Sequence, residues 1–113
     1  MVAEMLREFE LNRALTLFVT QGGDFIGEAT LYDFDGRGSA EISFRVAREH
    51  TRMGYGGKIL EGLIEISREI GLLTLKARAR KDNEISLSLL KKHGFAEAGA
   101  EDSVVFFKQD LSE

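Results

Sequence analysis

The chain has 113 residues, of which 43% are hydrophobic and 30% are charged, enough for one domain with a single core. Fifteen Lys and Arg stand against nineteen Asp and Glu, which gives a net charge of −4. This charge argues against a general nucleic-acid binder, because such proteins need a basic surface.

Other classes of site are excluded by residue counts. The sequence has no cysteine and two histidines, so disulfides, thiolate metal sites and a cysteine nucleophile are absent and a typical zinc site is not expected. No apolar run approaches the ~20 residues of a membrane span, and the acidic N-terminus lacks the apolar stretch of a signal peptide. We therefore expect a cytoplasmic protein with no metal and no membrane partner.

The first half of the chain shows the alternation typical of strands. Residues 1–12 fit either a short helix or a first strand, and this alternative stays open. Residues 14–20 alternate Leu and Val with Thr and Phe. Glycine-containing turns separate this strand from two further strands, at residues 25–34 and 40–47. Together the three strands are predicted to form an antiparallel meander.

A glycine-rich turn then leads into an amphipathic helix that ends at Gly71. The first turn of a helix has unpaired N–H groups at the positive end of its dipole, and residues without Cβ let an anion approach them. Arg52 and Lys58 add positive charge on either side of the glycines. The turn therefore predicts a phosphate or pyrophosphate cradle, although glycines alone fit an ordinary flexible turn about as well.

The remaining elements complete one domain. Residues 72–79 read as a fourth strand, and the preceding helix makes it a parallel neighbour of the third strand. A second helix is expected to begin near Asn83, a good N-cap residue, and to end at Gly94. Residues 95–98 and 103–109 are predicted to form a closing hairpin. The fold class is thus α/β with a mixed sheet, in the order β-β-β-α-β-α-β-β.

Two motifs give this order a resemblance to a known family. The stretch from Thr51 to Gly56 is similar to the Gln/Arg-x-x-Gly-x-Gly/Ala loop of the GNAT acyltransferase superfamily. The stretch from Asn83 to Phe95 is similar to the family's Asn-x-x-(Ala/Ser)-x-x-Leu-Tyr-x-x-x-Gly-Phe motif. With the order of elements, the resemblance covers about residues 14–110. It implies a meander joined to a parallel, splayed strand pair, and acetyl-CoA or another acyl-CoA as co-substrate.

The resemblance also implies which residues contact the cofactor. The loop amides from Arg52 to Lys58 would hold the pyrophosphate, and the backbone around Phe44 would pair with the pantetheine arm. Asn83 would hydrogen-bond this arm, and Ser86 and Leu90 would line its channel. The full set of implied cofactor contacts is Phe44, Arg45, Val46, Thr51, Arg52, Met53, Gly54, Tyr55, Gly56, Gly57, Lys58, Asn83, Ser86 and Leu90.

The chain departs from the family pattern in three places. Thr51 replaces the first Gln or Arg of the loop, with Arg52 beside it. Leu90 stands where many members carry a Tyr that protonates the leaving thiolate, and leucine cannot donate a proton. The N-terminal segment 1–12 is shorter than the strand and two helices that precede the meander in the family. The acceptor side is therefore expected to be truncated, or completed by the second subunit of a homodimer.

The implied reaction is N-acetyl transfer by direct attack of an amine, carried by a small molecule or a protein, on the thioester. It needs a base, an oxyanion stabiliser and an acid. Glu41 is the candidate base and the amide of Val46 the candidate stabiliser, although a half-exposed sheet glutamate would look the same. Tyr32 or a bound water could act as the acid. Glu28 could line the acceptor pocket with Tyr32, or both could be solvated.

Several features allow a simpler interpretation. The basic residues from Lys76 to Lys81 fit a solvated strand face, or contact with the CoA 3′-phosphate or an acidic acceptor. His50 fits a surface turn better than a nucleotide contact, and His93 fits a structural role near a helix C-terminus. Leu90 and the short N-terminal segment also favour an alternative function, a non-catalytic acyl-CoA-binding sensor or regulatory module.

Overall fold

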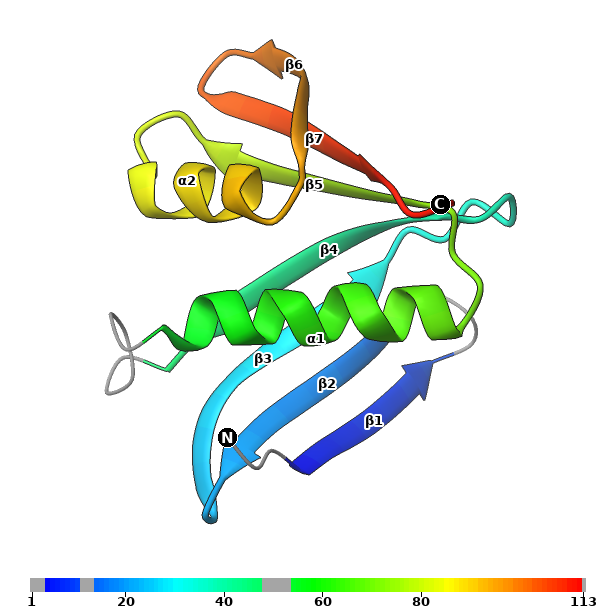
Figure 1. The fold of residues 1–113 in the computed structure, drawn as a ribbon, viewed down its shortest axis with the longest axis vertical. Coiled ribbons are helices and arrows are strands. Elements are labelled where there is room, and N and C mark those ends of the chain that lie inside the picture. The colour runs from blue at the N-terminus through cyan, green and yellow to red at the C-terminus, as the bar shows by residue number, and fades with distance from the viewer. Residues whose placement is uncertain (1–3, 11–13, 48–53, 113) are drawn as a thin grey trace.

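The computed structural model describes residues 4–10, 14–47 and 54–112, with side chains from residue 14 onwards. These residues form one mixed sheet of seven strands and two helices (Figure 1). The elements are β1 (Glu4–Glu10), β2 (Ala14–Gln21), β3 (Asp24–Tyr32), β4 (Ser39–Val46), α1 (Tyr55–Glu69), β5 (Thr74–Arg80), α2 (Glu84–Lys92), β6 (Ala96–Glu101) and β7 (Val104–Asp110).

The strands follow the order β1-β2-β3-β4-β5-β7-β6 across the sheet. The first four form an antiparallel meander, β4 and β5 are parallel, and β5, β7 and β6 are again antiparallel. The predicted mixed sheet and its element order are confirmed. The N-terminal segment, which the sequence left open between helix and strand, contains β1, so one strand precedes the predicted order.

The parallel pair is joined only at one end. Pairing of β4 with β5 runs from Ser39↔Thr74 to Glu41↔Lys76 and then stops. Beyond this point β4 stays paired with β3 and β5 stays paired with β7, so the two strands diverge as Figure 1 shows. The predicted splayed strand pair is confirmed, and we call the diverging part, residues 42–46 and 77–80, the fork.

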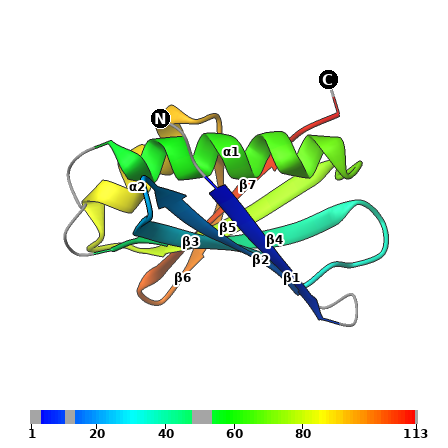
Figure 2. The same ribbon diagram turned by 90° about the horizontal axis from the view of Figure 1, so that it is seen from below.

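The core lies between the sheet and the helices. Alternation in β2 buries Leu15, Leu17 and Val19 on the face that α1 covers (Figure 2). From α1, Leu60 and Leu63 are almost completely buried, and each such side chain stabilises the fold by about 1.5–3 kcal/mol. The other face of β2, β3 and β4 carries mainly polar side chains, and in the described part of the chain no helix covers it.

Both helices are amphipathic, with 15 residues in α1 and 9 in α2. α1 directs Lys58 and its glutamates to solvent, and α2 exposes most of its length. Neither helix of the described residues has the length and apolar character needed to cross a membrane. Their buried sides meet the same core, which brings the N-terminus of α1 close to α2.

Candidate functional site

A cavity of about 300 Å³ occupies the fork. Its walls come from β4, β5 and α2, with one residue of β3: Tyr32, Ile42, Ser43, Phe44, Ala77, Arg78, Ala79, Arg80, Asn83, Ser86 and Leu90. The small side chains of Ala77 and Ala79 leave room between the strands. The structure thus brings four predicted cofactor contacts, Phe44, Asn83, Ser86 and Leu90, around one space.

The backbone of β4 presents unpaired groups to this cavity. The amide of Ala47 donates to the carbonyl of Ile26 at 2.7 Å. In an antiparallel ladder every second residue bonds to the same neighbour, so Arg45 and Ser43 also direct their backbone groups to β3. Phe44 and Val46 therefore direct their amides and carbonyls toward β5, where pairing has ended. The described residues offer these groups no hydrogen-bond partner. A free backbone edge therefore forms one wall of the fork.

Arg45 does not share this arrangement. The same alternation turns its amide toward β3, and its side chain lies on the sheet face opposite α1. There its Nε lies 3.0 Å from Oε1 of Glu28, and its guanidinium lies 5.7 Å from the ring centre of Phe25. The fork does not bring Arg45 together with the other predicted contacts.

The N-terminus of α1 begins at Gly54, whose φ of 81° is the left-handed conformation that glycine adopts without strain. A Cβ at Gly54 would meet nothing, whereas one at Gly56 would lie 3.1 Å from Cδ2 of Leu89, and one at Gly57 would lie 3.3 Å from Cε1 of His93. Gly56 and Gly57 therefore also allow the close approach of α2. No hydrogen bond to their amides is found within the described part of the chain, as expected for a first helical turn.

The rest of the predicted phosphate loop is only partly described. Tyr55 is half-buried and Lys58 is exposed in the first turn of α1. The remaining predicted loop contacts, Thr51, Arg52 and Met53, lie outside the described residues, and so does His50, for which a surface turn was favoured.

Asn83 is the N-cap residue of α2, as the sequence predicted. The side chain of Asn83 caps the helix, because its Oδ1 accepts a hydrogen bond from the amide of Ser86 at 3.1 Å. This leaves the NH₂ group of Asn83 as a donor at the cavity wall. Leu90 is only 2% exposed and presents an apolar surface where the family motif has a phenol.

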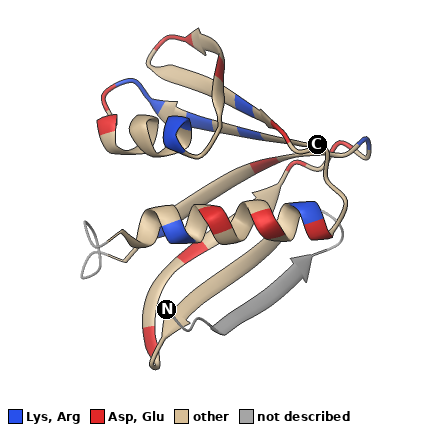
Figure 3. Cartoon of the chain, in the orientation of Figure 1, with Lys and Arg blue, Asp and Glu red and all other residues tan. Residues whose placement is uncertain are grey.

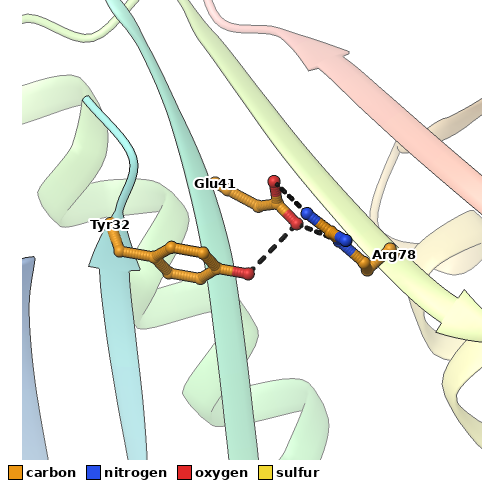
Figure 4. A network of polar contacts seen from close by, with 3 residues as sticks. All are labelled: Tyr32, Glu41 and Arg78. Carbon is orange, nitrogen blue, oxygen red and sulfur yellow. Dashed lines mark hydrogen bonds and ion pairs between the residues drawn. The ribbon is translucent and has the colours of Figure 1, made fainter. Parts of the chain in front are cut away.

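A polar network closes the narrow end of the fork (Figure 4). Glu41 is 9% exposed and accepts hydrogen bonds at Oε2 from Nε of Arg78, at 2.6 Å, and from the hydroxyl of Tyr32, at 3.0 Å. Nη2 of Arg78 also donates to Oε1 of Glu41 at 3.1 Å. The pairing of β4 with β5 ends at Glu41 and Lys76, and Arg78 lies two residues beyond this point on β5. The ion pair therefore bridges the two strands where they begin to diverge.

The network sets the acid–base properties of its members. The hydrogen bonds from Arg78 are the main reason why the pKa of Glu41 lies below its usual value. Burial, and then the hydrogen bond to Glu41, raises the pKa of Tyr32. Glu41 is thus ionised near neutral pH, but it binds a proton more weakly than an unpaired glutamate. The phenol of Tyr32 is a weaker acid than an ordinary tyrosine.

His93 joins the two helices. Its Nδ1 lies 2.9 Å from the carbonyl oxygen of Leu89, and its Nε2 lies 3.2 Å from the Glu61 carboxylate on α1. These contacts fit the structural role predicted for it. In the part of the chain that the structure describes, no group of three or more His, Asp or Glu side chains could hold a metal ion.

The fold and the fork define an acyltransferase-type domain, and sequence comparison identifies its family. The family model for the acetyltransferase (GNAT) domain matches residues 1–96. The chain therefore belongs to the GNAT acetyltransferase family. No curated protein matches the chain.

Solved structures share the fold. An IAA acetyltransferase from Bacillus cereus is 23% identical with a TM-score of 0.78, over 88% of this chain and 79% of that one. The ribosomal-protein-S18-alanine N-acetyltransferase from Escherichia coli is 23% identical with a TM-score of 0.80, over 92% and 73%. The Campylobacter jejuni N-acetyltransferase PseH, in complex with acetyl coenzyme A, is 20% identical with a TM-score of 0.82, over 89% and 70%. At these identities the similarity establishes the fold.

Proposed function

We propose that the protein is an N-acetyltransferase that moves the acetyl group of acetyl-CoA to an amine in the fork. The free backbone edge formed by Phe44 and Val46 beside the fork cavity carries this proposal. An extended ligand can complete such an edge as an added strand would. The structurally similar PseH was solved in complex with acetyl coenzyme A, which supports the same co-substrate here.

The described residues fit an acyl-CoA. The free edge of β4 would pair with the amide groups of the pantetheine arm, and Asn83, Ser86 and Leu90 would form the facing wall. The amides of Gly56 and Gly57 in the first turn of α1 would bind the pyrophosphate. The residues proposed for cofactor binding remain those predicted from the sequence, with Arg45 and the undescribed Thr51, Arg52 and Met53 resting on the resemblance alone.

The chemistry needs an attacking amine and a stabilised oxygen. The amine lone pair would form a bond to the carbonyl carbon of the thioester while the C–S bond breaks. We propose that the Val46 amide donates a hydrogen bond to the carbonyl oxygen as it gains negative charge. Glu41 remains the proposed base, because it is ionised and can accept the proton that the amine nitrogen loses. Attack on the thioester lowers the pKa of this nitrogen, so a weakly basic carboxylate is sufficient. Leu90 cannot protonate the departing sulfur, so Tyr32 or water would do so.

Replacing Val46 by proline tests the oxyanion role. The Val46 amide faces the fork, so proline removes this donor without breaking the β3–β4 ladder. We expect kcat for acetyl transfer to fall by about 10²–10³-fold, the usual cost of losing one oxyanion donor. Val46→Ala keeps the amide and should retain most of the activity. Equal rates for the two variants, measured as thiol release, would contradict the proposal.

A second function has one observation in its favour. Leu90 places a buried apolar side chain where the family motif carries a proton donor, which suits an acyl-CoA sensor without catalysis. Acetyl-CoA binding without thiol release for any amine in a broad panel would support the sensor. The amine acceptor, the cytoplasmic location and a homodimer whose second subunit completes the acceptor side are the remaining parts of the proposal.

A further inference from the structure

The charged side chains that line the fork cavity are of one sign and lie on the sheet face opposite α1. Among the described residues that line the cavity, Arg78 and Arg80 are charged, and none is an Asp or Glu. The two arginines are alternate residues of β5, so their side chains leave the same face roughly 7 Å apart. Figure 3 shows Lys and Arg along β5 and on the neighbouring β7.

Both guanidinium groups keep donors for a ligand. Arg78 uses Nε and Nη2 to bind Glu41, and Arg80 uses Nε and Nη2 to bind Asp82 at 3.1 and 3.2 Å. The side chains of Arg80 and Asp82 are 70% and 71% exposed, and such a surface ion pair contributes little. A ligand carboxylate can therefore replace Asp82 at Arg80, or bind beside it, at small cost.

The described lining of the cavity offers a cationic acceptor no carboxylate, because Asp33 interacts electrostatically with Arg78 but is not part of that lining. Both oxygens of Glu41 already accept hydrogen bonds, from Arg78 and Tyr32. Asp82 lies outside the cavity lining and is paired with Arg80. The second positive charge of a polyamine would instead lie close to two guanidinium groups, which bind planar carboxylates in fork geometry.

We infer that the acceptor is an amine that also carries a carboxylate. Arg80, with Arg78 beside it, binds this carboxylate while the amine enters the fork. The inference rests on the proposed acetyl transfer and names the chemical class of its acceptor.

The test compares amines that differ in one group. Each compound has a primary amine on a chain of similar length. The other end is a negative carboxylate in δ-aminovalerate, a neutral amide in its carboxamide and a positive amine in cadaverine. Thiol release from acetyl-CoA gives kcat/KM for each. We expect the carboxylate to exceed the carboxamide by roughly tenfold, the effect of one charge-assisted hydrogen bond. C-terminally amidated Gly-Glu-Glu and Gly-Gln-Gln show whether the carboxylate belongs to a small molecule or a peptide.

Arg80→Gln is the diagnostic variant, because it leaves Glu41 paired with Arg78. In this variant the ratio of kcat/KM for δ-aminovalerate to kcat/KM for its carboxamide should fall close to one. Lys108→Gln removes the same charge from β7 outside the fork cavity and should leave the ratio unchanged. Equal or better use of the carboxamide or cadaverine, or an unchanged ratio in Arg80→Gln, would overturn the inference but not the proposed transfer. Acetyl-CoA binding without turnover of any amine would overturn both, and so would the absence of acetyl-CoA binding.

Discussion

Glu41 shows how one residue can be identified from sequence while its environment cannot. Period-2 alternation placed it on the face opposite Ile42, and the structure agrees. Its partner Arg78 could not be predicted, because the parallel register sets Lys76 beside it and the pairing ends there. The contact that forms is the diagonal one, from Glu41 to the residue two positions beyond Lys76 on the same face of β5. The roles of Ser43, Ala77 and Ala79 in the cavity wall were missed for the same reason.

The lowered pKa of Glu41 predicts a pH-dependent stability. A carboxyl group whose pKa is lower in the folded state stabilises the fold above its unfolded value, about 4.5, and loses this contribution as pH falls through its folded value. We expect the melting temperature of the wild type to fall below pH 4.5 more steeply than that of Glu41→Gln. Thermal unfolding followed by circular dichroism between pH 7 and pH 3 measures this difference.

Glu65→Gln serves as a control for this pH series, since Glu65 is exposed on α1. It should follow the wild type. If the curves of the wild type and Glu41→Gln stay parallel across the acid range, the Arg78–Glu41 pair does not stabilise the fold.

At the scale of elements, the sequence predicted most of the fold. Alternation located β2 and β4, glycine-containing turns bounded β3, and the order of helix and strand placed β5. The helical wheel located α1, and the motif with Asn83 located α2. The strand at Glu4–Glu10 could not be distinguished from a helix, because its apolar positions are scattered among charges. The packing of Gly56 and Gly57 against α2 was also missed, since helix–helix contacts depend on how the fork orients β5. Those glycines indicated an anion site from sequence, and the structure adds a packing role.

Asn83 has two separable roles at the start of α2. Its Oδ1 caps the helix, and its NH₂ group is the proposed donor to the pantetheine arm. Asn83→Ala removes both roles. It should lower the free energy of unfolding by about 1 kcal/mol and should also weaken the binding of acetyl-CoA. Asn83→Asp keeps the cap and should restore stability but not affinity. Chemical denaturation and calorimetric titration of both variants test this separation, and full affinity in Asn83→Asp would refute the contact.

At the scale of the molecule, the sheet is two antiparallel units held together at one short parallel contact. Within the described residues, strand pairing joins the meander β1–β4 to the group of β5, β7 and β6 only from Ser39↔Thr74 to Glu41↔Lys76. The fork follows from this arrangement, because each inner strand stays paired with its own unit. The N-terminal end of α1 and the whole of α2 lie at the open end of the fork (Figure 1), and in the described part of the chain no helix covers the opposite face.

The central claim is that the co-substrate occupies the fork along the free edge of β4, and filling the fork tests it most directly. Ala79 is buried in the cavity wall, so Ala79→Leu places additional atoms into this space, while Ala100→Leu adds the same atoms on exposed β6. Calorimetric titration with acetyl-CoA should show binding to the wild type and Ala100→Leu, and at least roughly tenfold weaker binding to a folded Ala79→Leu, a loss of about 1.4 kcal/mol. Equal affinity for all three proteins, or no binding to the wild type, would contradict it.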